Sequence, residues 1–206
     1  TQLDENFVAI CSAQLGCVIK NFGMFGNTTL RALHNLDRHK SAIESSEYVI
    51  MEFGGNDCDH HWSEIADNPS AEHHPFISIP QYSEQLHELI ASVQSLGAKP
   101  ILLSLPPIIA DKYFDTFTKD MSREQRDNVL LWLNGCLENI TQWHDMYNLA
   151  LFKLASDTGV EILDITTPFL AKREYRTLFC NDGIHPNALG HKLIAETICN
   201  STNIWN

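Results

Sequence analysis

The feature that most constrains the fold is a short run of residues, 48–53 (YVIMEF), that is almost continuously apolar and leads directly into Gly54-Gly55. Such a run is typical of a strand covered by helices on both faces, as in a parallel sheet. Two similar runs, 101–105 and 160–164, come later, and segments with helical spacing of apolar residues separate the three. Strands that alternate with helices indicate βαβ crossovers. The sequence therefore predicts an α/β fold with a mostly parallel, doubly wound sheet.

Helical spacing of apolar residues predicts five segments. They are 7–15, 28–36, 78–96, 122–157 and 187–199. The fourth is long enough for two helices, with a break near Asn134-Gly135. Residues 17–21 form a short β-prone run, and the polar, histidine-rich stretch 58–80 predicts a long loop with one helical turn.

The composition is that of one globular domain without a nucleic-acid partner. A chain of 206 residues fits a single α/β domain, 1–206. Acidic residues outnumber basic ones 26 to 14, and no basic patch occurs, which argues against nucleic-acid and anionic-membrane partners. No apolar run is long enough to span a bilayer. The six cysteines lack a CxxC pair, as expected of reduced thiols in a cytoplasmic protein, although a segment before Thr1 could have carried a signal peptide.

Three polar clusters follow predicted strands or turns. They are 21–26 (NFGMFG), 54–57 (GGND) and 182–186 (DGIHP). In open α/β sheets, ligands bind beyond the carboxyl ends of the strands, because loops and helix N-termini converge there. We therefore expect the three clusters to line one cleft.

The third cluster has the spacing of a general base and its orienting carboxylate. Asp182 lies three residues before His185, on a turn ahead of a helix. A carboxylate placed there can bind one imidazole nitrogen while the other nitrogen faces the cleft. The structural alternative is that Asp182 caps the helix and His185 is a surface residue.

The other two clusters contain donors suited to a developing oxyanion. Asn56 carries a side-chain amide, and Gly26 can offer a main-chain N–H, with Gly23 as a weaker candidate. The structural alternative for all three is the geometry of a tight turn.

Taken together and in this order, NFGMFG, EFGGND and DGIHPN resemble blocks II, III and V of the SGNH (GDSL-like) hydrolases, over residues 18–198. The resemblance implies a flavodoxin-like, three-layer α/β/α fold with strand order 2-1-3-4-5. It also implies Ser-His-Asp hydrolysis of small-molecule esters or thioesters, without a cofactor or metal. By position, Gly26 and Asn56 match the oxyanion donors, which act with the N–H of the nucleophile. Asp182 and His185 match the block V pair.

The sequence departs from the family pattern at block I, because no strand with a Gly-Asp-Ser motif precedes the helix at Phe7. A sheet without this central strand would leave buried backbone groups unpaired. We therefore expect the domain to lack an N-terminal piece that carries the serine. Neither Ser104, at the end of a strand, nor Ser12, within a helix, stands on a strand-to-helix elbow, so the nucleophile stays unassigned.

Two alternatives remain open. One is a non-catalytic binding module on the same fold. The other is a metal-dependent hydrolase that uses the acidic and histidine-rich segment 57–74, although the HExxH spacing is absent. The substrate is not identifiable, but aromatic residues of two loops are expected to wall the cleft. They are Trp62, Phe76, Tyr113 and Phe114.

Overall fold

The computed structural model describes residues 6–201 and 204–205. Three parallel strands form one sheet in the order β1 (Tyr48–Met51), β2 (Lys99–Leu103) and β3 (Glu161–Leu163). Ile50 lies opposite Ile101, and Leu102 opposite Ile162. The α/β class and the parallel sheet are therefore confirmed.

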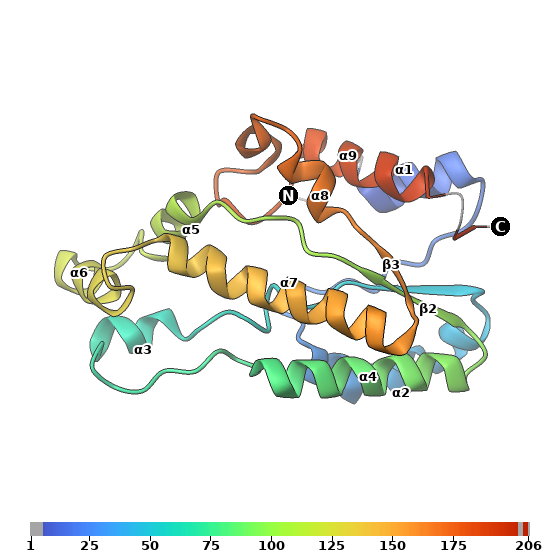
Figure 1. The fold of residues 1–206 in the computed structure, drawn as a ribbon, viewed down its shortest axis with the longest axis horizontal. Coiled ribbons are helices and arrows are strands. Elements are labelled where there is room, and N and C mark those ends of the chain that lie inside the picture. Colours follow the sequence, from blue (N-terminus) through green and yellow to red (C-terminus); the bar gives the residue numbers. More distant parts are fainter. Residues whose placement is uncertain (1–5, 202–203, 206) are drawn as a thin grey trace.

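Helices cover both faces of this sheet (Figure 1). On one face lie α2 (Thr29–Glu44), α4 (Ile79–Ser95) and α7 (Glu138–Thr158), and on the other lie α1 (Phe7–Leu15), α8 (Thr166–Leu170) and α9 (Ala188–Cys199). Each face of the sheet has its own apolar core, and alternate residues of β2 point into one or the other. Leu102 packs with α2, α4 and α7, whereas Ile101 and Leu103 pack with α1, α8 and α9. Full burial of each such side chain stabilises the fold by roughly 1.5–3 kcal/mol.

A third apolar cluster lies at one end of the molecule, beyond the carboxyl ends of the strands (Figure 1). It is formed by α3 (Trp62–Asp67), α5 (Ala110–Phe117), α6 (Arg123–Trp132) and the start of α7. The predicted break between α6 and α7 is confirmed, with Asn134 and Gly135 at φ of 54° and 70°. Helices α5 and α8 and the 3₁₀ helix Tyr175–Leu178 were not predicted.

The β-prone run 17–21 does not form a strand, which corrects that expectation. No strand among the described residues lies beside this run, and an isolated strand has no partner for its backbone groups. Val18 is accordingly 88% exposed. Strand β1 pairs with β2 alone among the described residues, and Ile50 is 37% exposed.

Capping residues place the helices that approach the carboxyl edge of the sheet. The Thr28 hydroxyl accepts from the Arg31 N–H at the start of α2, and the Asn187 side chain accepts from the Leu189 and Gly190 N–H groups at the start of α9. Helix α9 thus begins at Ala188, three residues after His185. Across residues 6–201 and 204–205, no helix combines the length and apolar character that crossing a bilayer requires.

Candidate active site

Asp182 and His185 form a hydrogen-bonded pair on the turn before α9. The Asp182 Oδ2 lies 2.9 Å from the His185 Nδ1, while Oδ1 accepts from the main-chain N–H groups of Ile184 and His185, each at 3.0 Å. Burial raises the pKa of the Asp182 carboxyl, but these hydrogen bonds outweigh it and leave the pKa lowered. The ionised carboxylate therefore fixes the imidazole ring. The Nε2 makes no hydrogen bond within the described ranges, and the side chain is 54% exposed.

The start of helix α5 packs against this turn. The Ile109 N–H donates to the Gly183 carbonyl at 2.8 Å. Gly183 has φ of 78°, and a Cβ at this position would lie 2.7 Å from the Ile109 carbonyl oxygen. A further connection is the ion pair between Arg176 and Asp111, with Nη2 to Oδ2 at 2.7 Å. Close packing of main chain on main chain thus requires glycine at position 183.

The two predicted oxyanion residues lie beside this pair. The Asn56 Nδ2 donates to the Asn27 carbonyl at 3.1 Å, which joins the turn after β1 to the loop that contains Gly26. In the described part of the chain the Gly26 N–H has no hydrogen-bond acceptor. The ring of Phe25 meets the His185 ring edge-on, with centroids 6.0 Å apart. The structure therefore brings Gly26, Asn56, Asp182 and His185 to one edge of the sheet.

Two acidic residues near this edge were missed by the sequence reasoning. Asp57 is fully buried and accepts hydrogen bonds from Thr29 and Gly54. Glu52 follows β1; its surface is exposed, yet the surrounding protein desolvates the carboxyl and raises its pKa, and the nearby His185 opposes this effect. The motif GGND includes Asp57, but no pattern linked it to Thr29.

The serines considered in the sequence have structural roles. Ser104 is buried, and its Oγ accepts from the Ile165 N–H at 2.8 Å and the Thr166 N–H at 3.0 Å. The Ser12 hydroxyl donates to the Cys17 carbonyl at 2.6 Å. Within residues 6–201 and 204–205, no serine hydroxyl hydrogen bonds to His185.

The expected aromatic wall is only partly at the surface. Trp62 and Phe114 are buried in the third apolar cluster, and Trp62 stacks on Phe117 at 4.2 Å, because α3 and α5 pack these rings inward. Phe76 is exposed and Tyr113 is half-buried. Trp62 and Phe114 therefore support the wall and do not form its surface.

The described residues contain no group of three or more His, Cys, Asp or Glu side chains arranged to hold a metal ion. His60 of the histidine-rich segment is instead buried among Trp62, Trp132 and Trp143, with ring centroids 5.5, 5.2 and 4.9 Å away. His61 packs edge-on against Phe76.

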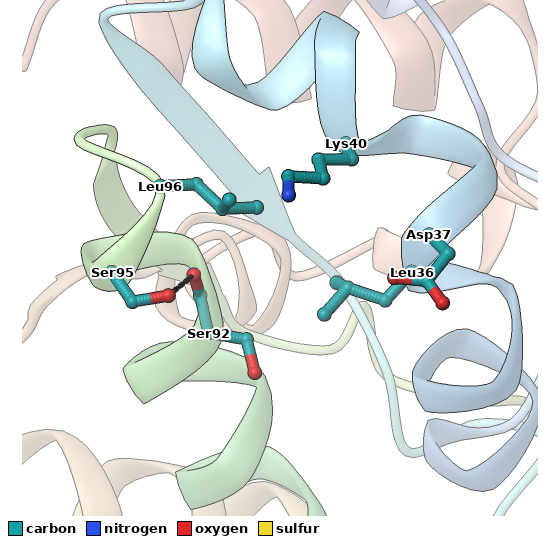
Figure 2. A pocket seen from close by; sticks show the side chains of 6 residues that line it. All are labelled: Leu36, Asp37, Lys40, Ser92, Ser95 and Leu96. Carbon is teal, nitrogen blue, oxygen red and sulfur yellow. Dashed lines mark hydrogen bonds between the residues drawn. The ribbon is translucent and has the colours of Figure 1, made fainter.

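A cavity of about 200 Å³ lies between α2 and α4, away from these residues. Figure 2 shows the side chains that line it, with the Ser95 hydroxyl donating to the Ser92 carbonyl. Helix α4 ends at Ser95, shortly before β2 begins at Lys99, so the cavity is at the amino ends of the strands. It is thus on the opposite edge of the sheet from His185.

A parallel sheet between two layers of helices, with a histidine held by a carboxylate at its carboxyl edge, defines an open α/β protein with a candidate site at the edge where ligands bind in this class. The chain belongs to the GDSL-like lipase/acylhydrolase family, whose sequence profile matches residues 2–193. The SGNH resemblance seen in the motifs is thereby confirmed.

Relatives of known name agree with this membership. The chain is 27% identical to GDSL esterase/lipase CPRD49 of Arabidopsis thaliana over 85% of its residues, and it spans 62% of that relative's length. It is 24% identical to the isoamyl acetate-hydrolyzing esterase 1 homolog of Mus musculus, over 89% of this chain and 68% of the mouse protein.

Solved structures share the fold at lower identity. The α/β hydrolase LAE5 from the metagenome of Lake Arreo has a TM-score of 0.67 at 20% identity, covering 98% of this chain and 83% of LAE5. A catalytic mutant of the acetylxylan esterase Axe2 from Geobacillus stearothermophilus has a TM-score of 0.67 at 19% identity, covering 94% of this chain and 79% of Axe2.

Proposed function

We propose that the protein hydrolyses carboxylic esters by a serine mechanism in which His185 is the general base. The observation that carries this proposal is the hydrogen bond of 2.9 Å between the His185 Nδ1 and the Asp182 carboxylate, beside a loop with an unbonded Gly26 N–H. Membership of a lipase and acylhydrolase family supports the reaction class.

The serine would be carried by a strand outside residues 1–206, which together with them would complete a single domain. Two features of the sheet support this part of the proposal. The edge of β1 opposite β2 has no strand beside it among the described residues, and Ile50 on β1 is partly exposed. A strand paired with this edge would cover Ile50 and direct its carboxyl end toward His185.

In the proposed reaction, the His185 Nε2 takes the proton of the serine hydroxyl as its oxygen attacks the ester carbonyl. The Gly26 N–H and the Asn56 amide donate to the oxyanion of the tetrahedral intermediate. The intermediate expels the alcohol, which receives the proton from His185. Water then attacks the acyl-enzyme in the same way and releases the acid and the free serine.

Acetyl esters are the first substrates to test. The mouse relative is named as an isoamyl acetate-hydrolyzing esterase homolog, and the Axe2 neighbour is named as an acetylxylan esterase. We propose a small-molecule acetyl or other short-chain ester as the substrate class.

A serine-directed fluorophosphonate probe tests the mechanism. We expect the whole protein to be labelled at one serine outside residues 1–206, and we expect His185→Ala to slow the labelling by several orders of magnitude. Ser12→Ala in the whole protein, which removes a hydroxyl that donates to the Cys17 carbonyl, is the matched control and should leave the labelling unchanged. A whole protein that neither reacts with the probe nor hydrolyses acetyl esters would favour the alternative of a non-catalytic binding module.

A further inference from the structure

Asp57 connects the two loops that contain the proposed oxyanion donors. Its Oδ1 accepts from the Thr29 N–H at 2.9 Å and from the Thr29 hydroxyl at 2.5 Å, and its Oδ2 accepts from the Gly54 N–H at 3.1 Å. Thr29 opens α2, three residues after Gly26, and Gly54 begins the turn that contains Asn56. One carboxylate therefore binds both segments at once.

Side chains alone hold these two segments together. In the part of the chain that the structure describes, no main-chain hydrogen bond joins 21–29 to 52–58. The remaining hydrogen bond between them runs from the Asn56 Nδ2 to the Asn27 carbonyl. The separation of the two loops thus depends on Asp57 and on Asn56 itself.

The surroundings of Asp57 fix its orientation. The side-chain amide of Gln85, on α4, lies 2.6 Å from the Thr29 hydroxyl and restrains it from a third element. Asp57 also faces the N-terminus of α2, where the helix dipole favours a negative charge. Burial raises the pKa of the Asp57 carboxyl, and the hydrogen bonds from Thr29 and Gly54 oppose this effect. Burial of a carboxylate costs desolvation free energy even when several donors bind it. An apolar side chain that only filled the same space would avoid this cost.

We propose that Asp57 is a positioning residue that, together with Thr29, sets the distance between the Gly26 main-chain donor and the Asn56 amide. The proposal rests on the ester hydrolysis proposed above. Oxyanion donors stabilise the transition state only when both lie about 2.7–3.1 Å from the position that the oxyanion takes. If the two donors move away from these positions, the transition state is bound less tightly while substrate binding changes little. The expected result is a lower kcat with KM nearly unchanged.

Substitutions at Thr29 and Asp57 in the whole protein test the proposal. Thr29→Val keeps the shape of the side chain and removes the hydroxyl, whereas Thr29→Ser keeps the hydroxyl. Asp57→Asn places an amide N–H₂ against the Gly54 N–H. With an acetyl ester substrate, we expect Thr29→Val and Asp57→Asn to lower kcat roughly 10- to 100-fold, with KM within about twofold of the wild-type value. Thr29→Ser, which keeps the hydroxyl, should retain most of the wild-type kcat.

Thr118→Val is the matched control for a lost buried hydroxyl. Thr118 is buried at the C-terminal end of α5, where its hydroxyl donates to the Phe114 carbonyl at 2.6 Å. We expect this variant to lower the Tm and leave kcat unchanged. If Thr29→Val and Asp57→Asn likewise lower only the Tm, or raise KM at constant kcat, Asp57 has a structural role and the proposal is wrong.

Hydrogen exchange separates this inference from the proposed function. The amides of Thr29 and Gly54 should be protected in the wild-type protein, and Asp57→Asn should speed exchange at Gly54 at least roughly tenfold while Thr118→Val does not. Equal protection in Asp57→Asn would overturn the positioning role whether or not the protein is an esterase. A wild-type protein that shows this protection but does not hydrolyse esters would overturn the proposed function. Asp57 would then still join the two loops, but it would have no role in catalysis.

Discussion

At the scale of single residues, each group that we propose acts on the ester or the serine, namely His185, Asn56 and Gly26, has one hydrogen-bonding position occupied and one free. His185 uses Nδ1 to bind Asp182, and Asn56 uses one of its amide hydrogens to bind the Asn27 carbonyl. Gly26 accepts from Arg31 through its carbonyl at 3.1 Å, while its N–H has no acceptor in the described ranges. The occupied positions orient the groups, and the free ones remain available to a reacting ester.

Replacement of Asn56 tests the oxyanion assignment. We expect Asn56→Ala to lower kcat by roughly 10²–10³, because one of the donors to the oxyanion is lost. Asn128→Ala is the matched control, since the Asn128 Nδ2 also donates to a main-chain carbonyl, that of Ala66, but lies on α6. Steady-state hydrolysis of an acetyl ester measures both. Unchanged turnover in Asn56→Ala would remove this residue from the site.

Replacement of Gly183 tests the support that α5 gives to the histidine turn. A Cβ at position 183 would clash with the Ile109 carbonyl and force the turn away from α5. We expect Gly183→Ala to lower the free energy of unfolding by about 2–4 kcal/mol and to lower kcat as His185 moves. Gly135→Ala controls for backbone strain, because Gly135 has a similar φ of 70° with open space around its Cβ position. The Tm and kcat of the two variants are compared. Equal losses in Gly183→Ala and Gly135→Ala would contradict this role of α5.

Sequence distance explains which site residues could be predicted. Asp182 and His185 lie three residues apart on one turn, so the local spacing indicated their contact. Asp57 and Thr29 are 28 residues apart and come from different elements. A single sequence contains no signal for such a contact, because it exists only once α2 packs beside the end of β1.

At the scale of elements, the same contrast separates predicted from missed structure. The helices with many buried periodic positions, α4 and α9, were predicted to within one residue of their bounds. Helix α5 was missed although Ala110, Tyr113, Phe114 and Phe117 have helical spacing, since two prolines precede it and it is only 8 residues long. The run 17–21 has strand propensity but no neighbouring strand, so tertiary context decided its conformation.

The open edge of β1 gives a prediction at this scale. In the whole protein, where we propose that a strand covers this edge, Ile50→Lys should lower the free energy of unfolding by about 1.5–3 kcal/mol. Leu131→Lys, at an exposed position on α6, is the matched control and should change it by less than about 0.5 kcal/mol. Denaturant unfolding of the two variants measures the difference. Equal, small effects of both substitutions would contradict the missing-strand proposal.

At the scale of the whole molecule, the third apolar cluster is a separate stabilising unit. The sheet and its two helical layers form two cores, whereas α3, α5 and α6 form their own cluster at the end of the molecule. This cluster contains a buried histidine, His60, whose Nδ1 has no hydrogen-bond partner within the described residues. The start of α5 contacts the turn of His185 through the hydrogen bond from the Ile109 N–H to the Gly183 carbonyl.

The burial of His60 predicts that the molecule loses stability in mild acid. Burial, followed by the charges of His73, His74 and His61, lowers the pKa of His60 from 6.5 to about 4. Between these two values the unfolded chain binds a proton that the folded chain does not, so the free energy of unfolding falls as the pH drops from 6.5 towards 4. The loss amounts to at most about 3 kcal/mol, and above pH 6.5 this contribution is fully present.

Denaturant unfolding of His60→Phe at about pH 7.5 and about pH 4.5 tests this dependence. We expect the variant to lose much of the difference between the two pH values, since an aromatic ring of similar shape among Trp62, Trp132 and Trp143 has no proton to bind. His87→Phe, on the exposed face of α4, is the matched control and should keep the wild-type difference. Tryptophan fluorescence is the appropriate signal, because three of the four tryptophans surround His60. A His60→Phe variant as acid-sensitive as the wild type would place the loss of stability at carboxyls whose pKa is lowered in the folded protein, such as Asp182.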